Sequence, residues 1–128
     1  MNLLGIGTDI VNIKRIKRSL RNNIRLKKKI FTQNEINFCE KKKKPESYFA
    51  KKFAAKEALS KAIGTGFSSG ITFNKIEVLN NTKGKPFFKL SNSINKKIKE
   101  KTGNKKFSIF LSVSDDDPWA IATVVISF

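Results

Sequence analysis

The stretch Phe53-Ala-Ala-Lys-Glu-Ala-Leu-Ser-Lys-Ala-Ile-Gly-Thr-Gly66 is rich in alanine, yet it carries one carboxylate and two lysines. Residues four apart share a helix face, so Phe53, Glu57 and Lys61 fall on one stripe, in line with the aromatic Phe49. A carboxylate beside buried rings needs a cation, a metal or several hydrogen bonds as partners. Glu57 is therefore a site candidate. The alternative is an ordinary Glu57–Lys61 helix pair that stabilises the helix by ~0.2–0.5 kcal/mol.

Composition narrows the chemistry. A chain of 128 residues suits one domain, spanning residues 1–128. A single cysteine, Cys39, excludes an intramolecular disulfide framework, and the absence of histidine excludes ordinary zinc sites and histidine-based triads. Any catalysis is thus left to carboxylates, lysines and hydroxyls.

The net charge of +17 indicates an acidic partner: a nucleic acid, a membrane surface or an acidic protein. A genome rich in A and T would also raise the lysine content everywhere, so the positions of the arginines carry more information. All four arginines lie between Arg15 and Arg25, which makes that segment the better candidate for a docking surface. The apolar runs are too short to span a membrane, and the N-terminus lacks signal-peptide features, so we expect a cytoplasmic protein.

The N-terminal stretch Leu3–Val11 is typical of a short buried strand that carries one carboxylate, Asp9. Gly5 and Gly7 do not make a dinucleotide fingerprint, because no third glycine and no helix follow at the required spacing. They indicate instead a backbone that something approaches closely. The alternative role for Asp9 is a helix cap.

A basic amphipathic helix is predicted next, over residues 13–24, with its isoleucines and Leu20 on one face and its arginines elsewhere. Such a helix can dock an acidic helix, bind calmodulin-like partners, lie on a membrane or present a solvated charged face. Thr32-Gln-Asn-Glu35 is a capping box that opens a second helix, with Ile36 and Cys39 inward. Ser47 is expected to cap the long helix, which ends at Gly64.

The C-terminal half predicts two antiparallel hairpins separated by a helix. The first pairs Ile71–Leu79 with Pro86–Leu90, and the second pairs Phe107–Val113 with Trp119–Ser127 across Asp115–Pro118. Ser91 caps the intervening helix, which is closed by Gly103. The predicted class is α+β, with an antiparallel sheet packed against one long helix.

Five blocks along nearly the whole chain resemble the holo-acyl-carrier-protein synthases, which are small phosphopantetheinyl transferases. The blocks, in order and with matching gaps, are Gly5-Ile-Gly-Thr-Asp-Ile-Val11, Lys52-Phe-Ala-Ala-Lys-Glu-Ala58, Lys61-Ala-Ile-Gly-Thr-Gly66, Gly84-Lys-Pro86, and Leu111-Ser-Val-Ser-Asp115 followed by Ala120-Ile-Ala-Thr-Val124. Each block alone is weak, but their combination is specific. The resemblance implies the 4'-phosphopantetheinyl transferase fold and a homotrimer with active sites between subunits. It also implies that coenzyme A, with Mg²⁺, donates 4'-phosphopantetheine to a serine of apo acyl carrier protein, which releases 3',5'-ADP and activates fatty acid synthesis.

By the same resemblance, Asp9 and Glu57 hold the magnesium, Lys61 contacts the transferring phosphate, and either Glu57 or a metal-bound water accepts the serine proton. Two further sets follow. The coenzyme A cleft would be lined by Lys52, Phe53, Lys56, Gly64, Thr65, Gly66 and Pro86, and the acidic carrier protein would dock on Arg15, Arg18, Arg25 and Leu26. This chemistry suits a charged pyrophosphate, which needs a hard cation, carboxylates and lysines.

The sequence departs from the family pattern at two positions. Phe110 stands where members often carry histidine. Lys52 stands at a position that is often arginine, so a single ammonium replaces a guanidinium group that could bind two oxygens at once.

Two other functional classes compete with this assignment. A nucleic-acid-binding module would explain the charge but lacks a recognisable motif, and a membrane-surface helix would lack aromatic anchors, so we expect neither partner.

Overall fold

Two antiparallel sheets make the β part of the computed structural model, which describes residues 1–66 and 71–128. The larger sheet has the strand order β1-β5-β4, with β5 in the middle. Its strands are β1 (Leu3–Asn12), β4 (Ser108–Asp116) and β5 (Trp119–Ser127). The smaller sheet pairs β2 (Ile76–Asn80) with β3 (Pro86–Leu90). Both predicted hairpins are therefore confirmed, at adjusted boundaries.

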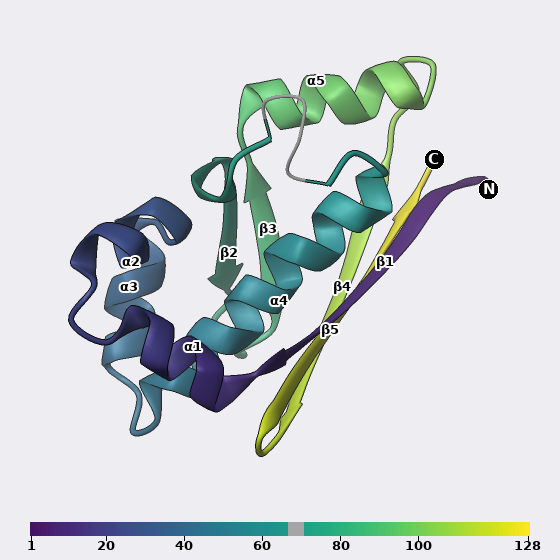
Figure 1. The fold of residues 1–128 in the computed structure, drawn as a ribbon. Helices are drawn as coiled ribbons and strands as arrows, with labels where there is room; N and C mark the ends of the chain where they lie inside the picture. The colour runs from purple at the N-terminus through teal and green to yellow at the C-terminus, as the bar shows by residue number, and fades with distance from the viewer. Residues whose placement is uncertain (67–70) are drawn as a thin grey trace.

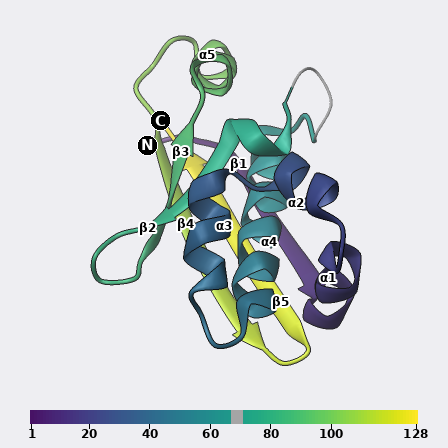
Figure 2. The same cartoon turned by 90° about the vertical axis from the view of Figure 1, so that its left-hand side faces the viewer.

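The long helix α4 (Pro45–Ile63) runs along the inner face of the larger sheet, as Figure 1 shows. Shorter helices gather beside the N-terminal half of α4, and another lies near its C-terminal end (Figures 1 and 2). They are α1 (Ile13–Leu20), α2 (Ile24–Ile30), α3 (Gln33–Glu40) and α5 (Asn92–Lys101), with a short 3-10 helix η1 (Phe73–Lys75) before β2. The predicted α+β architecture, with an antiparallel sheet against one long helix, is confirmed.

The contact between α4 and β1 is unusually close because it is made by small residues. A Cβ atom on Gly5 would lie 2.0 Å from the carbonyl oxygen of Ala62, and one on Gly7 would lie 1.9 Å from that of Ala58. The glycines therefore admit the backbone of α4, which is the close approach expected for this stretch. The alanine face of α4 then joins Leu59 in a core shared with the inner faces of both sheets.

The predicted single helix over residues 13–24 is wrong. The chain breaks between α1 and α2, where Asn22 has a positive φ of 52° and the Asn23 side chain accepts a hydrogen bond from Leu26 N–H. Asparagine tolerates the left-handed region and caps helices well, so two adjacent asparagines end one helix and start the next. Ile24 is consequently 60% exposed rather than buried.

Three other boundaries differ from the prediction. The long helix begins at Pro45 after Lys44, so Ser47 lies inside its first turn and is not the cap. Ile71 and Thr72 have no regular secondary structure and Phe73–Lys75 form η1, so the strand starts only at Ile76. In the second hairpin β4 extends to Asp116, which pairs with Trp119 and leaves a shorter turn. By contrast, the capping box of Thr32 and Glu35 and the end of α4 at Gly64 are confirmed.

The outer face of the larger sheet is apolar and exposed. Ile6 of β1, Val125 of β5 and Phe110 of β4 lie opposite one another in one row, and Ile6 and Phe110 are 68% and 58% exposed. A second apolar pair, Ile10 and Ile121, lies further along. A row of hydroxyl side chains, Thr8, Thr123 and Ser112, separates the two apolar clusters. Exposed apolar clusters of this kind mark an interaction surface. Within the described ranges, no helix has the length and apolar content needed to cross a membrane.

Candidate active site

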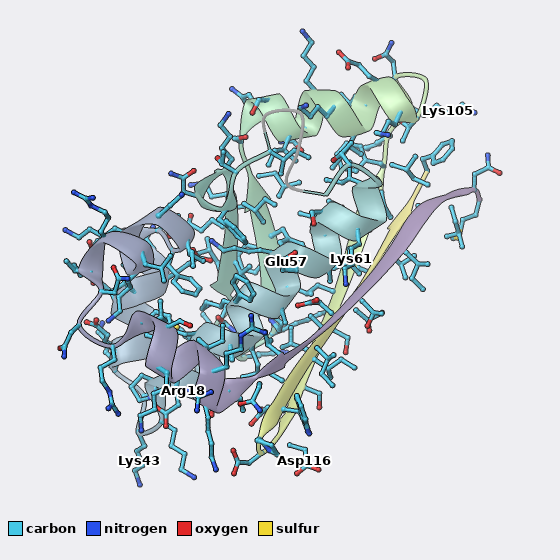
Figure 3. The ribbon with its side chains drawn as sticks, viewed as in Figure 1. Arg18, Lys43, Glu57, Lys61, Lys105 and Asp116 are labelled. Carbon is cyan, nitrogen blue, oxygen red and sulfur yellow. The ribbon has the colours of Figure 1, made fainter. Side chains whose placement is uncertain are left out.

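Asp9, Glu57 and Lys61 meet where β1 passes α4. The Lys61 ammonium donates to Asp9 Oδ1 at 3.2 Å and to the Thr8 carbonyl at 2.9 Å, and it lies one helical turn from Glu57 (Figure 3). The close packing of Gly7 on α4 sets this arrangement, since Asp9 follows two residues later and points to the same side of the strand. The sequence-predicted metal pair and its neighbouring lysine are thus brought together.

The environment changes the protonation of Glu57. Burial raises the pKa of the Glu57 carboxyl, and the nearby negative charge of Asp9 raises this pKa further, while Lys61 lowers it. A raised carboxyl pKa is typical of a group that accepts and releases protons. The effect of Asp9 on the Glu57 pKa is consistent with two like charges lying close together at this point.

These three residues line an open groove of about 500 Å³ between β1, the helices α1 and α2, and α4. Phe53, Arg15 and Leu26 line the same groove, so the predicted catalytic residues share it with two predicted carrier-protein contacts. Arg18 and Arg25 are exposed on α1 and α2 but are not part of this lining. Of these three arginines, Arg15 is therefore the one that reaches the groove, while Arg18 and Arg25 add positive charge to the exposed surface of the neighbouring helices.

The donor set at this site fits magnesium. Asp9 and Glu57 offer carboxylate oxygens, which are the ligands that Mg²⁺ prefers, and Mg²⁺ commonly uses one or two carboxylates together with substrate phosphates. Across residues 1–66 and 71–128, no group of three or more histidine, cysteine, aspartate or glutamate side chains gathers as a metal cage. A metal here would need to complete its coordination with solvent and substrate.

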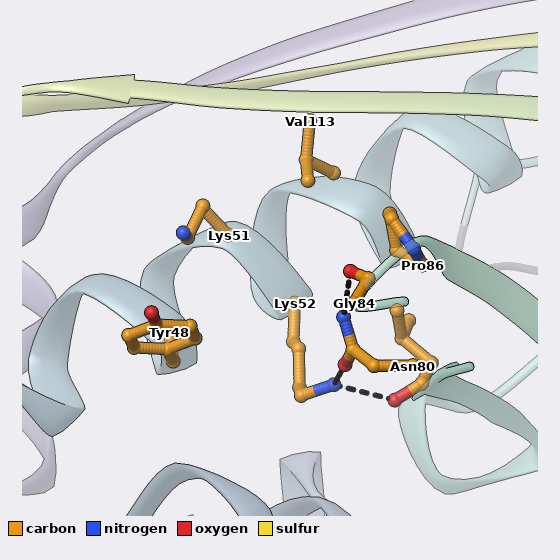
Figure 4. A pocket seen from close by; sticks show the side chains of 8 residues that line it. Tyr48, Lys51, Lys52, Asn80, Gly84, Pro86 and Val113 are labelled. Atoms are coloured by element: carbon orange, nitrogen blue, oxygen red, sulfur yellow. Dashed lines mark hydrogen bonds between the residues drawn. The ribbon is translucent and has the colours of Figure 1, made fainter. Parts of the chain in front are cut away.

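Lys52 and Pro86 line a second pocket, of about 190 Å³, on another face of α4. The Lys52 ammonium donates to the Val78 carbonyl and to the side-chain oxygen of Asn80. The side-chain NH₂ group of Asn80 in turn donates to the Gly84 carbonyl (Figure 4). These bonds hold the turn before β3 against α4. Two of the residues assigned to coenzyme A, Lys52 and Pro86, are thus brought together, but in a different pocket from Glu57.

The prediction that Lys56 lines the coenzyme A cleft is wrong. Its side chain is 0% exposed, and its ammonium forms a 2.6 Å ion pair with Glu35 on α3. Burial lowers the pKa of Lys56, and the Glu35 carboxylate opposes that shift. The sequence motif could not distinguish Lys56 from Lys61, because it places both lysines on the same helix. Only the packing of α3 against α4 decides which of the two lysines is buried.

Gly64, Thr65 and Gly66 follow α4 directly, about one turn beyond Lys61. Gly64 has a φ of 91° and ends the helix in the left-handed conformation. Their assignment to coenzyme A stays a prediction. Sequence reasoning missed Tyr48, Lys51 and Asn80 in the second pocket, and it recognised Glu35 only as a helix cap. A capping box gave no sign that the same carboxylate would be buried.

Known proteins match this chain over almost its full length. The family model described as the 4'-phosphopantetheinyl transferase superfamily matches residues 5–124. The holo-[acyl-carrier-protein] synthase of Pelagibacter ubique is 42% identical over 126 residues, covering 98% of each chain. That of Vibrio campbellii is 44% identical over 127 residues, again covering 98% of each chain.

Solved structures agree with this match. The crystal structure of the Neisseria meningitidis holo-[acyl-carrier-protein] synthase has a TM-score of 0.85 and 37% identity, covering 99% of this chain and 100% of that one. The Helicobacter pylori holo-[acyl-carrier-protein] synthase, solved in complex with coenzyme A, has a TM-score of 0.80 and 33% identity, covering 95% of this chain and 99% of that one. The chain therefore belongs to the holo-[acyl-carrier-protein] synthase family of enzymes, within the 4'-phosphopantetheinyl transferase superfamily.

Proposed function

We propose that this chain, as one transferase domain, transfers 4'-phosphopantetheine from coenzyme A to a serine of apo acyl carrier protein in a Mg²⁺-dependent reaction. The observation that carries the proposal is the convergence of Asp9, Glu57 and Lys61 on one groove that Arg15 also lines. The names of its relatives, and the coenzyme A complex of one of them, support the same donor and acceptor.

The residues divide the chemistry between them. Asp9 and Glu57 would hold the Mg²⁺, which supplies a hard positive charge for the pyrophosphate oxygens. Either Glu57 or a water held by the metal accepts the serine proton, and the position of Glu57 beside the reacting groups suits it to this role. The serine Oγ then forms a bond to the phosphorus that carries pantetheine, and the bond from that phosphorus to the bridging oxygen breaks. The electron pair leaves with 3',5'-ADP, while Lys61 donates to the transferring phosphate.

The donor and the acceptor use different surfaces. Lys52 and Pro86 bind the nucleotide end of coenzyme A, with Phe53 and the loop of Gly64, Thr65 and Gly66 nearer the reacting phosphates. The carrier protein is an acidic partner for Arg15, Arg18 and Arg25, with Leu26 as an apolar contact in the groove. This assignment uses the arginine segment for docking and requires neither nucleic acid nor membrane.

A homotrimer built on the outer face of the larger sheet completes the proposal. The exposed row of Ile6, Val125 and Phe110 supplies an apolar surface that needs a cover. In one chain, Lys52 and Glu57 line separate pockets. In the proposed trimer, a site shared between neighbouring subunits would place a nucleotide pocket next to a catalytic groove. Phe110 then serves this interface, at the position where members of the family often carry histidine. Activation of fatty acid synthesis in the cytoplasm is the corresponding cellular role.

The decisive experiment mixes the purified protein with apo acyl carrier protein, coenzyme A and Mg²⁺, and follows the carrier by intact mass. We expect one phosphopantetheine per carrier protein, with 3',5'-ADP released in equal amount and no reaction in EDTA. Transfer that persists in EDTA would refute the metal role. Equal inhibition by duplex DNA and by excess carrier protein would favour a nucleic-acid-binding function instead.

A further inference from the structure

Lys56 and Glu35 form a buried pair of opposite charges between the groove and the second pocket. Both side chains are 0% exposed, and Lys56 Nζ lies 2.6 Å from Glu35 Oε1. The same ammonium donates to the carbonyl oxygens of Ile30 at 2.7 Å and Phe73 at 3.1 Å. A lysine has three N–H donors, so all of them are used inside the protein and none is left for a phosphate.

Glu35 is saturated in a similar way. Its Oε1 also accepts from Thr32 N–H at 2.8 Å, and its Oε2 accepts from Val78 N–H at 2.9 Å. No buried side-chain nitrogen or oxygen is left without a partner across the part of the chain that the structure describes. The pair therefore ties α4 to four other segments: the end of α2, the start of α3, η1 and β2.

On the groove side, the pair holds two lining residues. Ile30 lines the groove, and its carbonyl is bound directly by Lys56. Phe53 also lines the groove, and its ring stacks on the ring of Phe73 with centroids 5.4 Å apart. Because Lys56 binds the Phe73 carbonyl, it fixes the residue against which Phe53 rests.

On the other side, the pair reaches the second pocket through β2. Val78 lines that pocket, its N–H donates to Glu35, and its carbonyl accepts from Lys52 at 2.7 Å. Lys52 in turn binds Asn80 at 2.9 Å. A shift of Glu35 would therefore move β2 and, with it, the partners that orient Lys52.

We infer that Lys56 and Glu35 are positioning residues that act as one unit, setting the Ile30 and Phe53 wall of the catalytic groove and the Val78 wall of the nucleotide pocket. This inference rests on the proposed transfer reaction and reassigns Lys56 within it. Lys56 contacts neither coenzyme A nor the carrier protein, despite its place beside Glu57 in the sequence.

The test is a double-mutant cycle of Lys56→Met and Glu35→Gln, with Lys52→Met as the matched change of a buried lysine that lines the nucleotide pocket. Thermal unfolding, kcat and the KM for coenzyme A are measured well below the midpoint of every variant. Each single change leaves one buried charge unpaired, so we expect Tm to fall by about 10 °C. Misplaced walls should lower kcat by roughly 10- to 100-fold in both single variants.

The double variant separates positioning from stability. Removing both charges should restore part of the lost Tm, because no unpaired charge is then buried, although the amide and the two carbonyls that lose their donor still cost some stability. Its kcat should stay as low as that of either single variant, because the carbonyls of Ile30 and Phe73 still lack their donor. Amide exchange at Val78 should be faster in Glu35→Gln than in the unchanged protein. Lys52→Met should mainly raise the KM for coenzyme A.

Other outcomes would overturn the inference. Unchanged kcat and KM in the folded variants would make the pair a purely structural one. A raised KM for coenzyme A in Lys56→Met but not in Glu35→Gln would make Lys56 a phosphate ligand. Absence of transfer by the unchanged protein would instead refute the proposed function. If the single variants fail to fold, the double variant still tests the inference. A kcat that recovers together with Tm in the double variant would contradict a positioning role for the pair.

Discussion

The backbone of Gly7 passes so close to Ala58 that a Cβ atom on Gly7 would lie 1.9 Å from the Ala58 carbonyl oxygen. The Cβ atom is fixed directly to the strand backbone and the oxygen is part of the helix backbone, so neither can move aside. We predict that Gly7→Ala lowers the free energy of unfolding by about 3 kcal/mol and separates Asp9 from Glu57, with loss of activity. Denaturant unfolding and the carrier-protein assay measure the two effects.

Gly103→Ala is the control for that prediction. Gly103 has a φ of 66° with nothing within 4 Å of an added Cβ, so only backbone strain is introduced there, at about 1–2 kcal/mol. The Gly103→Ala variant should have normal transfer activity. A Gly7→Ala variant no less stable than the control would show that the strand and helix can separate without cost.

Sequence reasoning predicted the parts of this molecule that depend on local pattern. The long helix up to Gly64, the capping box and both hairpins follow from periodicity and turn chemistry. The break at Asn22 was missed because the apolar spacing continues across it to Ile24, and spacing alone contains no information about backbone direction.

The candidate site, like the fold, was predictable from the sequence only where it depends on local pattern. Asp9 and Glu57 stand out as carboxylates in apolar surroundings, and Lys61 stands out by its spacing of one turn from Glu57; the three meet in space. The burial of Lys56 and the role of Glu35 depend on how α3 packs against α4, a contact between segments distant in sequence. The separation of Lys52 from Glu57 likewise depends on which faces of α4 the two sheets cover, and no local pattern encodes that choice.

Glu57→Gln keeps the shape of the side chain and removes its charge. If Glu57 accepts the serine proton, kcat should fall by about 100-fold or more. For the unchanged protein, protonation of Glu57 removes the proton acceptor, so activity should fall as the pH drops into the carboxyl range. Intact-mass rates across a pH series measure both effects, and a flat acidic limb would contradict the assignment.

The stability of the same variant has a defined sign. A raised pKa means that the folded state binds the proton more tightly than the unfolded state, so the Glu57 carboxylate destabilises the fold above that pKa. Glu57→Gln should therefore be slightly more stable than the unchanged protein at neutral pH, by no more than about 0.5 kcal/mol for a partly exposed group. The difference should disappear as acid protonates Glu57. A less stable variant at neutral pH would show that the carboxylate has a stabilising partner.

Charge reversal of Arg15 and Arg18 tests the docking surface. We predict that Arg15→Glu with Arg18→Glu raises the KM for carrier protein at least about 10-fold, most strongly at low salt, with the KM for coenzyme A nearly unchanged. Steady-state kinetics at two salt concentrations provide the measurement.

The matched control reverses Lys101 and Lys106, which are exposed around the C-terminal end of α5, away from α1. The change in net charge is identical. Equal increases in the carrier-protein KM for both pairs would show that the overall positive field, rather than a docking face, attracts the carrier.

The outer sheet face gives a prediction about assembly. Ile6 is 68% exposed in one chain and would be covered in the proposed trimer. Ile6→Glu should therefore yield monomers in light scattering and lose activity, since a carboxylate cannot be buried there without a partner. Lys89→Glu, on the exposed side of β3, is the control and should remain trimeric. An active monomer would contradict a site shared between subunits.

The order of strands in the larger sheet also determines when the protein can fold. β5 is the middle strand, between β1 and β4, yet it comes last along the chain; Thr8 pairs with Thr123 across most of the sequence. The first strand therefore has no partner until the final one has been synthesised, and the contact order is high. Until β5 is made, the hydrogen-bonding edge of β1 has no strand beside it, although the glycine face of β1 can already pack on α4. The larger sheet therefore closes in a late step, in which β5 pairs with both β1 and β4.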